Sequence, residues 1–330
     1  MTARVRITQE FITEALEEFE GTDIVVDPRE SPEPLGHDEL VADLAGYDAA
    51  ICLLTDHIDA ALLDANPSLR AVANVAVGYD NIDVPAATER GVVVLNTPDV
   101  LTDATADLTL TLMLSVARRV PEGDAFLRAG SYRYWRLKQE QLGLDVSGQT
   151  LGIFGLGKIG RAVAVRARGG FGMTVLYHNP NRLPLEQERE LGVEYVEFGE
   201  LLARSDFLSL HAPLTAQTRH VIDAAAFDAM PEHAVLINSG RGPLVDEAAL
   251  VEALRTGKIA GAGLDVFEFE PEVVPGLTDL RERVVLLPHL GSATERTRVR
   301  MARLAASGVR DVLQSKRPDN VVNPEVFDGS

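Results

Sequence analysis

The chain has 330 residues, of which 46% are hydrophobic and 25% charged, an ordinary composition for a soluble globular protein. This length favours two domains over a single core, and no apolar stretch approaches the roughly 20 residues that span a bilayer. The net charge of −19, from 31 basic and 50 acidic residues, argues against nucleic acid as a partner because its phosphates would be repelled.

Two further features of the composition indicate where the protein works. Residues 1–7 are charged and strand-like, with no apolar signal core behind them. Cys52 is the only cysteine and has apolar neighbours, so we expect a buried strand thiol, no intrachain disulfide and a cytoplasmic location. The basic residues are 27 Arg and 4 Lys. Together with the acidity this ratio suggests a salt-adapted organism, although a GC-rich genome explains it equally well.

Short apolar runs alternate with helical stretches along the chain, which predicts an α/β fold with parallel sheets covered by helices on both faces. Strands are expected at residues 48–54, 69–74, 150–154, 174–178, 206–211, 234–238 and 261–266. Helices are expected at residues 58–65, 102–119, 158–168, 246–256 and 292–314. Gly169 and Gly170 suggest a capping turn after the helix that ends at residue 168.

The segment 155–160, Gly-Leu-Gly-Lys-Ile-Gly, follows a predicted strand and opens a predicted helix, which is the context of a dinucleotide-binding fingerprint. Gly155 permits the tight turn, Gly157 lets the backbone approach a pyrophosphate, and Gly160 lets helix and strand pack closely. The phosphates would then meet free N–H groups at the positive end of the helix. Outside this context the three glycines would indicate only a turn.

The end of the next strand bears on which nicotinamide cofactor binds. NAD sites usually carry Asp or Glu about 20 residues after the glycines to bind the ribose 2′-hydroxyl. Residues 177–182 read Tyr-His-Asn-Pro-Asn-Arg and contain no carboxylate. Arg182 could bind a 2′-phosphate bidentately, with His178 and Asn179 beside it. We therefore expect NADP(H) to be preferred, with NAD(H) also accepted if Arg182 instead points to solvent.

Three residues later in the chain suit the reduction of a 2-oxo acid. His289, in Leu-Pro-His-Leu-Gly-Ser, is the candidate proton donor, because histidine is the residue type most often used for proton transfer near neutral pH. Glu270, directly before Pro271, would stabilise the protonated histidine and set its tautomer; Glu268 is the less favoured carboxylate. Arg241, in Asn-Ser-Gly-Arg-Gly, offers a planar fork that grips a carboxylate and polarises a carbonyl oxygen.

In this order and wording the fingerprint and the Arg, Glu and His segments closely resemble the D-isomer-specific 2-hydroxyacid dehydrogenases, particularly their glyoxylate/hydroxypyruvate reductase branch. The resemblance runs from about residue 73 to residue 324. It implies two doubly wound parallel-sheet domains, with a Rossmann-type cofactor domain, residues 101–290, inserted into a flavodoxin-like substrate domain, residues 1–100 and 291–330. The two longest predicted helices would form the hinge between them.

The resemblance also implies a substrate loop at residues 75–83. Backbone N–H groups around Val77 and Gly78 would receive the substrate carboxylate, and the glycine would permit a close approach. The alternative is a plain strand-to-helix turn with Asp83 as the helix cap. Leu53 lies where the family places an apolar wall for the substrate.

Trp135, the only tryptophan, lies in a polar stretch. In the reductase branch, an arm at this position crosses the twofold axis, and its tryptophan helps to wall the active site of the partner subunit. The alternative is a local packing anchor. A homodimer is expected in either case, because closed twofold dimers are the commonest assembly.

Further cofactor contacts follow from the same resemblance. Asp265 resembles the family aspartate near the nicotinamide amide, with a structural cap as the alternative, and Thr105 is a candidate phosphate contact. The remaining contacts would be Lys158, Ile159, His211, Pro213, Ser239, Gly240 and Gly291. We expect no metal.

The expected function is NAD(P)H-dependent reduction of glyoxylate or hydroxypyruvate to D-2-hydroxy acids, because Arg241, Glu270 and His289 match the three catalytic positions of the family. Phosphite dehydrogenase and other D-2-hydroxyacid dehydrogenases are alternatives. Formate dehydrogenase would carry glutamine at position 270, and 3-phosphoglycerate dehydrogenase usually carries a C-terminal extension for which this chain has no room. A nicotinamide-sensing binding protein, like the C-terminal binding protein corepressors, is the alternative from another class.

Overall fold

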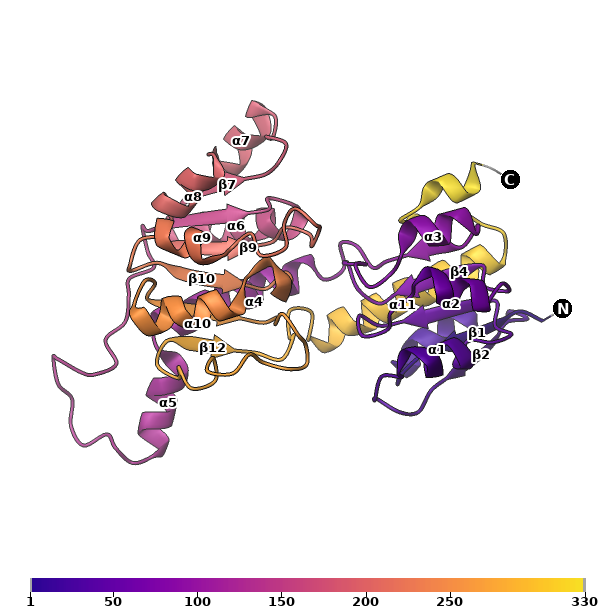
Figure 1. Cartoon of the computed structure of the whole chain (residues 1–330), viewed down its shortest axis with the longest axis horizontal. Coiled ribbons are helices and arrows are strands. Elements are labelled where there is room, and N and C mark those ends of the chain that lie inside the picture. Colours follow the sequence, from indigo (N-terminus) through magenta and orange to yellow (C-terminus); the bar gives the residue numbers. More distant parts are fainter. Residues whose placement is uncertain (1, 329–330) are drawn as a thin grey trace. The chain divides into compact units, whose positions relative to one another are not determined.

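The computed structural model describes residues 2–328. The chain forms two compact units, the first comprising the residues up to Leu101 with those from Ala293 onward, and the second comprising Thr102–Ser292. Met1, Gly329 and Ser330, which the predicted substrate domain includes, lie outside the described residues. Each unit is a parallel sheet with helices on both faces (Figure 1), so the predicted α/β fold class is confirmed.

The first unit has five parallel strands in the order β2-β1-β3-β4-β5, the order of flavodoxin-like folds. The strands are β1 (Arg4–Ile7), β2 (Val25–Pro28), β3 (Ala49–Cys52), β4 (Ala71–Asn74) and β5 (Val93–Leu95). The helices are η1 (Thr13–Phe19), α1 (His37–Asp43), α2 (Ala60–Ala65), α3 (Val84–Glu89), α11 (Glu295–Leu313) and η3 (Pro324–Phe327).

The central strand β3 shows why this sheet is apolar throughout. Ala49 and Ile51 pack in one core with α11 and η1, whereas Ala50 and Cys52 pack in the other with α1 and α2. Because successive side chains of a strand point to opposite faces, a strand covered on both faces needs an unbroken apolar run. The Cys52 thiol is fully buried, as predicted.

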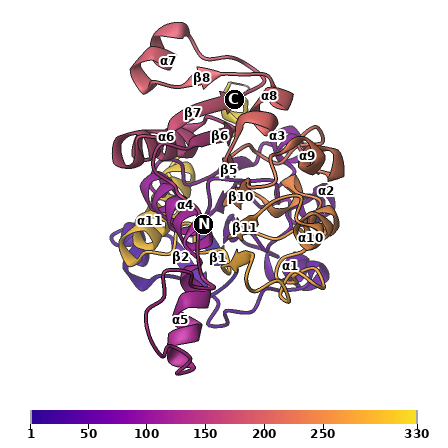
Figure 2. The same cartoon turned by 90° about the vertical axis from the view of Figure 1, so that its left-hand side faces the viewer.

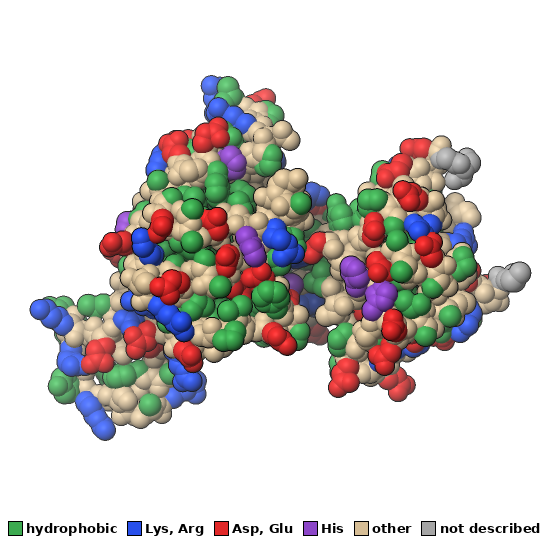
Figure 3. Space-filling view, in the orientation of Figure 1, with side chains coloured by type: hydrophobic (Ala, Val, Ile, Leu, Met, Phe, Trp, Pro, Cys, Tyr) green, Lys and Arg blue, Asp and Glu red, His purple; other side chains and the backbone are tan. Residues whose placement is uncertain are grey.

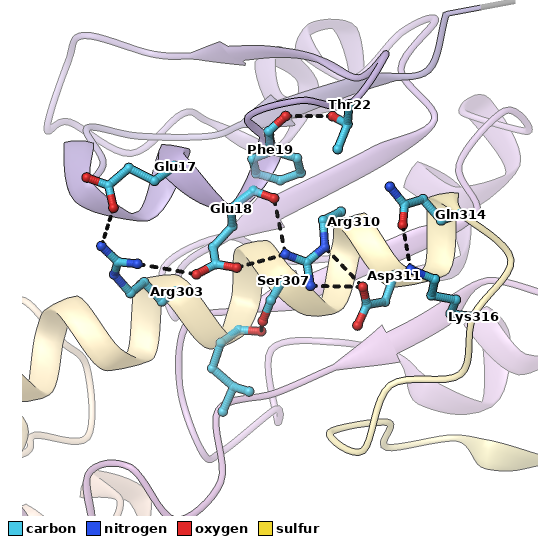
Figure 4. Close-up of polar contacts among 11 residues, drawn as sticks. Glu17, Glu18, Phe19, Thr22, Arg303, Ser307, Arg310, Asp311, Gln314 and Lys316 are labelled. Atoms are coloured by element: carbon cyan, nitrogen blue, oxygen red, sulfur yellow. Dashed lines mark hydrogen bonds and ion pairs between the residues drawn. The ribbon is translucent and has the colours of Figure 1, made fainter.

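A set of ion pairs joins α11 to η1 (Figure 4). Arg303 contacts Glu17 at 2.5 Å and Glu18 at 3.4 Å, and Arg310 contacts Glu18 at 2.8 Å. The two arginines are seven residues apart, so they lie on one face of the helix, where Glu18 accepts from both. Partly exposed pairs of this kind stabilise a fold by only about 0–1 kcal/mol each, so the buried apolar face of α11 contributes more.

The second unit has seven parallel strands in the order β12-β11-β10-β9-β6-β7-β8. The strands are β6 (Thr150–Phe154), β7 (Thr174–His178), β8 (Glu194–Tyr195), β9 (Phe207–Leu210), β10 (Val235–Asn238), β11 (Gly261–Leu264) and β12 (Val284–Leu286). The helices are α4 (Thr102–Ala117), α5 (Val120–Arg128), α6 (Lys158–Phe171), α7 (Leu185–Leu191), α8 (Phe198–Arg204), α9 (Ala224–Ala229), η2 (Gly242–Leu244) and α10 (Glu247–Thr256).

Helices cover both faces of this sheet as well. Figure 2 shows α4 and α6 on one side of the strands and α9 and α10 on the other. The strand β10 divides accordingly, because Val235 and Ile237 pack with α4 and α6 whereas Leu236 packs with α9 and α10. Within the described residues, no helix combines the length and apolarity that crossing a bilayer requires.

The predicted strands and helices are all present, with ends that differ by up to three residues. The capping turn predicted at Gly169 and Gly170 is wrong, because α6 continues through both glycines to Phe171. The helix ends at Gly172, which has a φ of 61° and donates its N–H to the carbonyl oxygen of Arg168. The cost of glycine inside a helix, about 1 kcal/mol, is evidently outweighed here by the packing of the apolar face of α6.

An arm projects from the second unit between α4 and β6. It consists of α5, which has no buried residue, and the segment 129–149 without a helix or strand. Several large apolar side chains on it are exposed, namely Val120, Leu127, Tyr132, Tyr134, Trp135, Leu137 and Leu142. Figure 3 shows the arm as a separate lobe at lower left with mixed apolar, basic and acidic side chains.

Candidate active site

The predicted site residues of the second unit gather at the carboxyl ends of its parallel strands. Gly155 follows β6, His211 follows β9, Arg241 lies three residues beyond β10, and His289 lies three residues beyond β12. The chain runs from β6 outward to β7 and β8 and then returns to β9 on the other side of β6. Such a reversal at the carboxyl edge opens the crevice in which α/β proteins bind ligands.

His289 and Glu270 form a direct contact, with 2.9 Å between Nδ1 of the imidazole and Oε2 of the carboxylate. The second carboxylate oxygen of Glu270 accepts the N–H of Phe267 at 2.9 Å. Burial acts to raise the pKa of Glu270, but the hydrogen bond and charge of His289, with the Phe267 N–H and the charge of Arg241, outweigh it and lower the pKa. The carboxylate is therefore ionised at neutral pH and holds Nδ1 as the protonated ring nitrogen.

Asp265 fixes the backbone directly after His289 through hydrogen bonds. The two oxygens of this buried carboxylate accept the N–H groups of Leu290 at 2.6 Å and Gly291 at 2.7 Å. Burial raises the pKa of Asp265, against the opposing effect of those two N–H groups. His289 itself has a φ of 53°, a left-handed conformation that non-glycine residues rarely adopt and that functional sites often contain. The structural-cap alternative for Asp265 thus has direct support.

Arg241 lies on a segment that two neighbours position. Asn238, the last residue of β10, donates its side-chain amide to the carbonyl of Arg241 at 2.9 Å and accepts the N–H of Gly240 at 3.1 Å. Gly242 packs against the backbone of Phe267, where an added Cβ would lie 1.9 Å from the carbonyl carbon. Only glycine fits there, so the Arg241 segment and the turn that carries Glu270 lie in direct contact.

Glu268, the rejected alternative, has a different partner. Its carboxylate contacts Nε2 of His220 at 2.5 Å, and its N–H donates to Oε1 of Glu247 at 2.9 Å. Burial, followed by the nearby charge of Glu268, raises the pKa of Glu247, although the Glu268 N–H opposes this. These three residues support the turn that carries Glu270, and sequence reasoning assigned no role to His220 or Glu247. The only signal was the pair of glutamates flanking position 269.

The glycine-rich turn has the shape that a dinucleotide phosphate requires. At Gly155, φ is 97° and an added Cβ would lie 2.4 Å from the Ala212 nitrogen; at Gly160 it would lie 2.5 Å from the Gly155 carbonyl oxygen. At Gly157 nothing lies within 4 Å, so this position faces open space. Gly157 is the N-cap of α6 and has no side chain, so an anion can approach the first turn of this helix, which begins with Lys158 and Ile159. The residues present therefore fit a bound dinucleotide.

The end of β7 differs in part from the expectation. Asn179 accepts the N–H of Leu156 at 2.7 Å through its side-chain oxygen and so ties β7 to the glycine-rich turn. Nδ1 of His178 contacts the carbonyl of Val196 at 3.0 Å, and its ring stacks with Phe154. Arg182 does not simply point to solvent, because its guanidinium is bound by a glutamate of α7.

The remaining cofactor candidates lie on or near the same edge. Nε2 of His211 contacts the hydroxyl of Ser209 at 2.8 Å, and the Ser239 hydroxyl lies 2.7 Å from that of Thr109 on α4. Thr105 is buried one turn earlier on α4, and its carbonyl accepts the Thr109 hydroxyl. Pro213 follows the His211 segment and is exposed.

The substrate candidates Leu53, Val77 and Gly78 lie in the first unit. The carbonyls of Val77 and Gly78 accept the side-chain amides of Asn96 and Asn74, each at 2.8 Å. Within the described residues, the N–H groups of Val77 and Gly78 have no recorded partner. Leu53 directly follows β3 and is half-buried. Asn74 and Asn96 were not predicted, although a buried polar residue ending an apolar strand, as Asn74 does, is a recognisable signal.

The plain-turn alternative for this loop predicted Asp83 as a helix cap, and that contact is present. The Asp83 side chain accepts the N–H of Ala86 at the start of α3. This cap is compatible with a carboxylate-binding role for the preceding loop. Trp135 is 67% exposed, which contradicts a local packing anchor, because its ring has few neighbours within the chain.

Comparison with known proteins decides the family. The model of the NAD-binding domain of D-isomer specific 2-hydroxyacid dehydrogenases matches residues 110–291. The glyoxylate reductase of Thermococcus litoralis is 46% identical over 318 residues, which are 96% of this chain and 94% of that protein. The chain belongs to the D-isomer specific 2-hydroxyacid dehydrogenase family. The resemblance of its motifs is thereby confirmed, and the second unit contains an NAD-binding domain of that family.

Two solved structures are similar to nearly the whole chain. A glyoxylate reductase from Paecilomyes thermophila is 36% identical with a TM-score of 0.86, covering 98% of this chain and 99% of that one. An NADPH-dependent glyoxylate/hydroxypyruvate reductase from Sinorhizobium meliloti, solved with NADP and malonate, is 36% identical with a TM-score of 0.85. That comparison covers 98% of this chain and 97% of the other. As a member of this family, the protein is an oxidoreductase.

Proposed function

We propose that this protein is a cytoplasmic, homodimeric reductase of small 2-oxo acids, glyoxylate or hydroxypyruvate first, that yields D-2-hydroxy acids and prefers NADPH. The observation that carries the proposal is the 2.9 Å contact between Nδ1 of His289 and Glu270 at the edge of an NAD-binding sheet. The names of the relatives from Thermococcus litoralis and Sinorhizobium meliloti support the substrate class.

The two ring nitrogens of His289 have different roles in the proposed reaction. A bound nicotinamide would supply the hydride. Since Glu270 engages Nδ1, the opposite nitrogen, Nε2, is the one that donates a proton to the developing alkoxide. The ionised Glu270 stabilises the imidazolium before that transfer. Arg241 binds the substrate carboxylate with its planar fork and polarises the carbonyl oxygen.

The substrate carboxylate would have a second partner in the first unit. The N–H groups of Val77 and Gly78 are suited to an anion, because within the described residues they have no hydrogen-bond partner, while Asn96 and Asn74 hold the carbonyls of the same two residues in place. We assign Leu53 to the apolar wall beside them.

The experiment is a comparison of His289→Ala with wild type, using NADPH and either glyoxylate or hydroxypyruvate. Loss of the proton donor should lower kcat by about 10²- to 10⁴-fold and leave the Kd of NADPH unchanged. His37→Ala is the matched control, because His37 lies at the start of α1 and is not one of the proposed catalytic, substrate-binding or cofactor-binding residues. Undiminished turnover in His289→Ala, or no turnover of either acid by a wild type that binds NADPH, would refute the proposal.

The homodimer rests on the arm. Tyr134, Trp135 and Leu137 are 68%, 67% and 78% exposed, and adjacent exposed apolar residues of this kind mark a protein interface. A cavity of about 410 Å³ lies at the base of the arm, lined partly by Val116 and Leu142. We propose that a second copy covers the arm and that Trp135 reaches the active site of that copy.

Analytical ultracentrifugation tests the assembly. Wild type should sediment as a dimer at micromolar concentration, and the triple variant Tyr134→Ser, Trp135→Ser, Leu137→Ser should shift toward monomer while its circular dichroism spectrum shows that it is still folded. A monomeric wild type would exclude the homodimer. A dimeric triple variant would exclude the arm as its interface.

A further inference from the structure

The residues after β7 contain a buried carboxylate for which the proposed chemistry has no use. Glu188 lies on α7, and only 7% of its side chain is exposed. Its Oε1 accepts Nε of Arg182 and the hydroxyl of Tyr177, each at 2.7 Å, and its Oε2 accepts Nη2 of Arg182 at 2.8 Å. The Tyr177 hydroxyl in turn accepts the N–H of Leu183 at 2.9 Å. The carboxylate therefore fastens both ends of the loop that carries Arg182.

We infer that Glu188 is a specificity-determining residue, which holds the Arg182 guanidinium in place for the 2′-phosphate of NADPH. This inference rests on the proposed cofactor preference and adds to it the residue that positions Arg182. The alternative reading of Glu188, as the carboxylate that binds the ribose 2′-hydroxyl of NADH, does not fit its contacts. Both of its oxygens are occupied, and the side chain is buried away from solvent.

The guanidinium keeps a free edge for a phosphate. Arginine has five N–H donors in a fixed planar fork, and Glu188 uses the edge formed by Nε and Nη2. Within residues 2–328, Nη1 has no recorded partner, and 52% of the Arg182 side chain is exposed. The ring of Tyr195 lies 5.4 Å from Cζ and restrains one face of the group. What remains accessible is the Nη1–Nη2 edge, which binds phosphate oxygens bidentately.

The position of this edge in the fold suits the phosphate. Arg182 follows β7 by four residues, and β7 is the second strand of the βαβ unit whose first strand, β6, leads into the glycine-rich turn. This is where a dinucleotide-binding fold places its ribose-binding side chain. Asn179 links the two segments through Leu156, so the loop end and the turn are held together.

Two opposing effects decide whether Glu188 helps or competes. Its negative charge reduces the attraction of the site for a phosphate, because charge repulsion falls only as the inverse of distance. Against this, an unrestrained Arg side chain loses rotamer freedom when it binds, and Glu188 and Tyr195 have already removed that freedom. A phosphate bound to the free edge would contact the guanidinium directly, whereas Glu188 would lie farther away, on the opposite edge of the guanidinium. The attraction between phosphate and Arg182 is therefore larger than the repulsion between phosphate and Glu188. The carboxylate therefore positions Arg182 more than it opposes the ligand.

The charge state of the network supports the same reading. The hydrogen bond from Arg182 is the largest influence on Glu188 and lowers its pKa, against burial. Burial and the contact with Glu188 raise the pKa of Tyr177 to about 12. The network therefore consists of an ionised carboxylate, a neutral phenol and a charged guanidinium over the whole range in which the enzyme would work.

The test measures the Kd of NADPH and of NADH separately, by quenching of protein fluorescence without substrate. The variants are Glu188→Gln, Tyr177→Phe and Arg182→Ala, with Glu186→Gln, two residues earlier on the same helix, as the matched control. Glu188→Gln should raise the Kd of NADPH by about tenfold and change the Kd of NADH by less than twofold. Tyr177→Phe keeps the carboxylate and removes one donor, so it should shift NADPH in the same direction by a smaller factor.

The outcomes separate this inference from the proposed cofactor preference. Equal loss of NADPH and NADH in Glu188→Gln, or tighter NADPH binding, overturns the inference, since the carboxylate would then be structural or a competitor. An unchanged NADPH Kd in Arg182→Ala overturns the proposed role of Arg182 itself. If NADPH binds more weakly to Arg182→Ala but with an unchanged Kd to both Glu188→Gln and Tyr177→Phe, the inference about Glu188 is overturned and the proposed role of Arg182 is not. Melting curves of each variant show which ones are folded, and Tyr177→Phe provides the same comparison if Glu188→Gln is not.

Discussion

His211 is an imidazole that the fold keeps neutral. It directly follows β9, and its Nε2 contacts the hydroxyl of Ser209 at 2.8 Å. Burial lowers its pKa from the ordinary value of 6.5 to about 4, because the charged form loses solvation there. A neutral ring beside the proposed nicotinamide site can donate or accept a hydrogen bond without adding charge.

This shift predicts how stability depends on pH. Between pH 6.5 and about 4 the unfolded chain protonates His211 and the folded chain does not, so the unfolded state binds more protons. Stability is therefore lost as the pH falls through this window, by roughly 2 kcal/mol for this residue between pH 7 and pH 5. Urea unfolding of wild type and His211→Gln at pH 7 and pH 5 should show a smaller acid loss in the variant. Equal losses would contradict the prediction.

At the scale of elements, the connection between β6 and α6 separates folding from binding. Gly155 combines a φ of 97° with a Cβ position 2.4 Å from the Ala212 nitrogen, whereas the Cβ position of Gly157 faces open space. The two glycines belong to one motif and are equally prominent in the sequence. Their structural surroundings differ, so we expect a side chain at Gly155 to affect stability and a side chain at Gly157 to affect cofactor binding.

Gly155→Ala and Gly157→Ala form a matched pair of variants. Gly155→Ala should lower the free energy of unfolding by about 2 kcal/mol or more, through backbone strain and the clash with Ala212. Gly157→Ala should keep the wild-type stability within about 0.5 kcal/mol but weaken NADPH at least tenfold, because the methyl group would occupy the space for the pyrophosphate. Urea unfolding and fluorescence titration measure the two effects. An unaltered NADPH Kd in Gly157→Ala would contradict the binding of the pyrophosphate at this turn.

At the scale of the molecule, the dominant property is the net charge of −19. Like charges on one folded chain repel each other, and unfolding moves them apart. Dissolved salt screens this repulsion, with a Debye length of about 10 Å at 0.1 M and about 3 Å at 1 M. An anionic substrate and cofactor must also approach through this field, so Arg241 and the N-terminus of α6 supply the local positive charge.

The melting temperature should therefore rise with salt. Scanning calorimetry from about 0.05 M to 1 M KCl should show an increase of several degrees, most of it by about 0.5 M, where screening is nearly complete. A fall in melting temperature would contradict the prediction. A chain that folds only in molar salt would favour the salt-adapted source, whereas a modest rise that levels off would favour a compositional origin of the Arg excess.

Local patterns in the sequence were sufficient for much of this protein. Apolar runs and helical stretches predicted the α/β class and the types of the elements, because strand and helix periodicity are properties of short segments. The order of the glycine-rich turn, Arg241, Glu270 and His289 predicted the family, and parallel strands bring such residues to one edge whatever the rest of the chain does. The sequence also predicted that Glu270 and not Glu268 contacts His289, because only Glu270 is followed by a proline.

Only the tertiary structure decided which side chains are already engaged. Arg182 looked available for a phosphate, yet Glu188 binds it bidentately, and His220 reaches Glu268 across 48 positions of sequence. The end of α6 beyond its two glycines was decided in the same way, by packing against the sheet. The physical reason is common to all three. Hydrogen bonds and packing between segments far apart in the chain depend on distances that exist only after folding, and no local pattern encodes those distances.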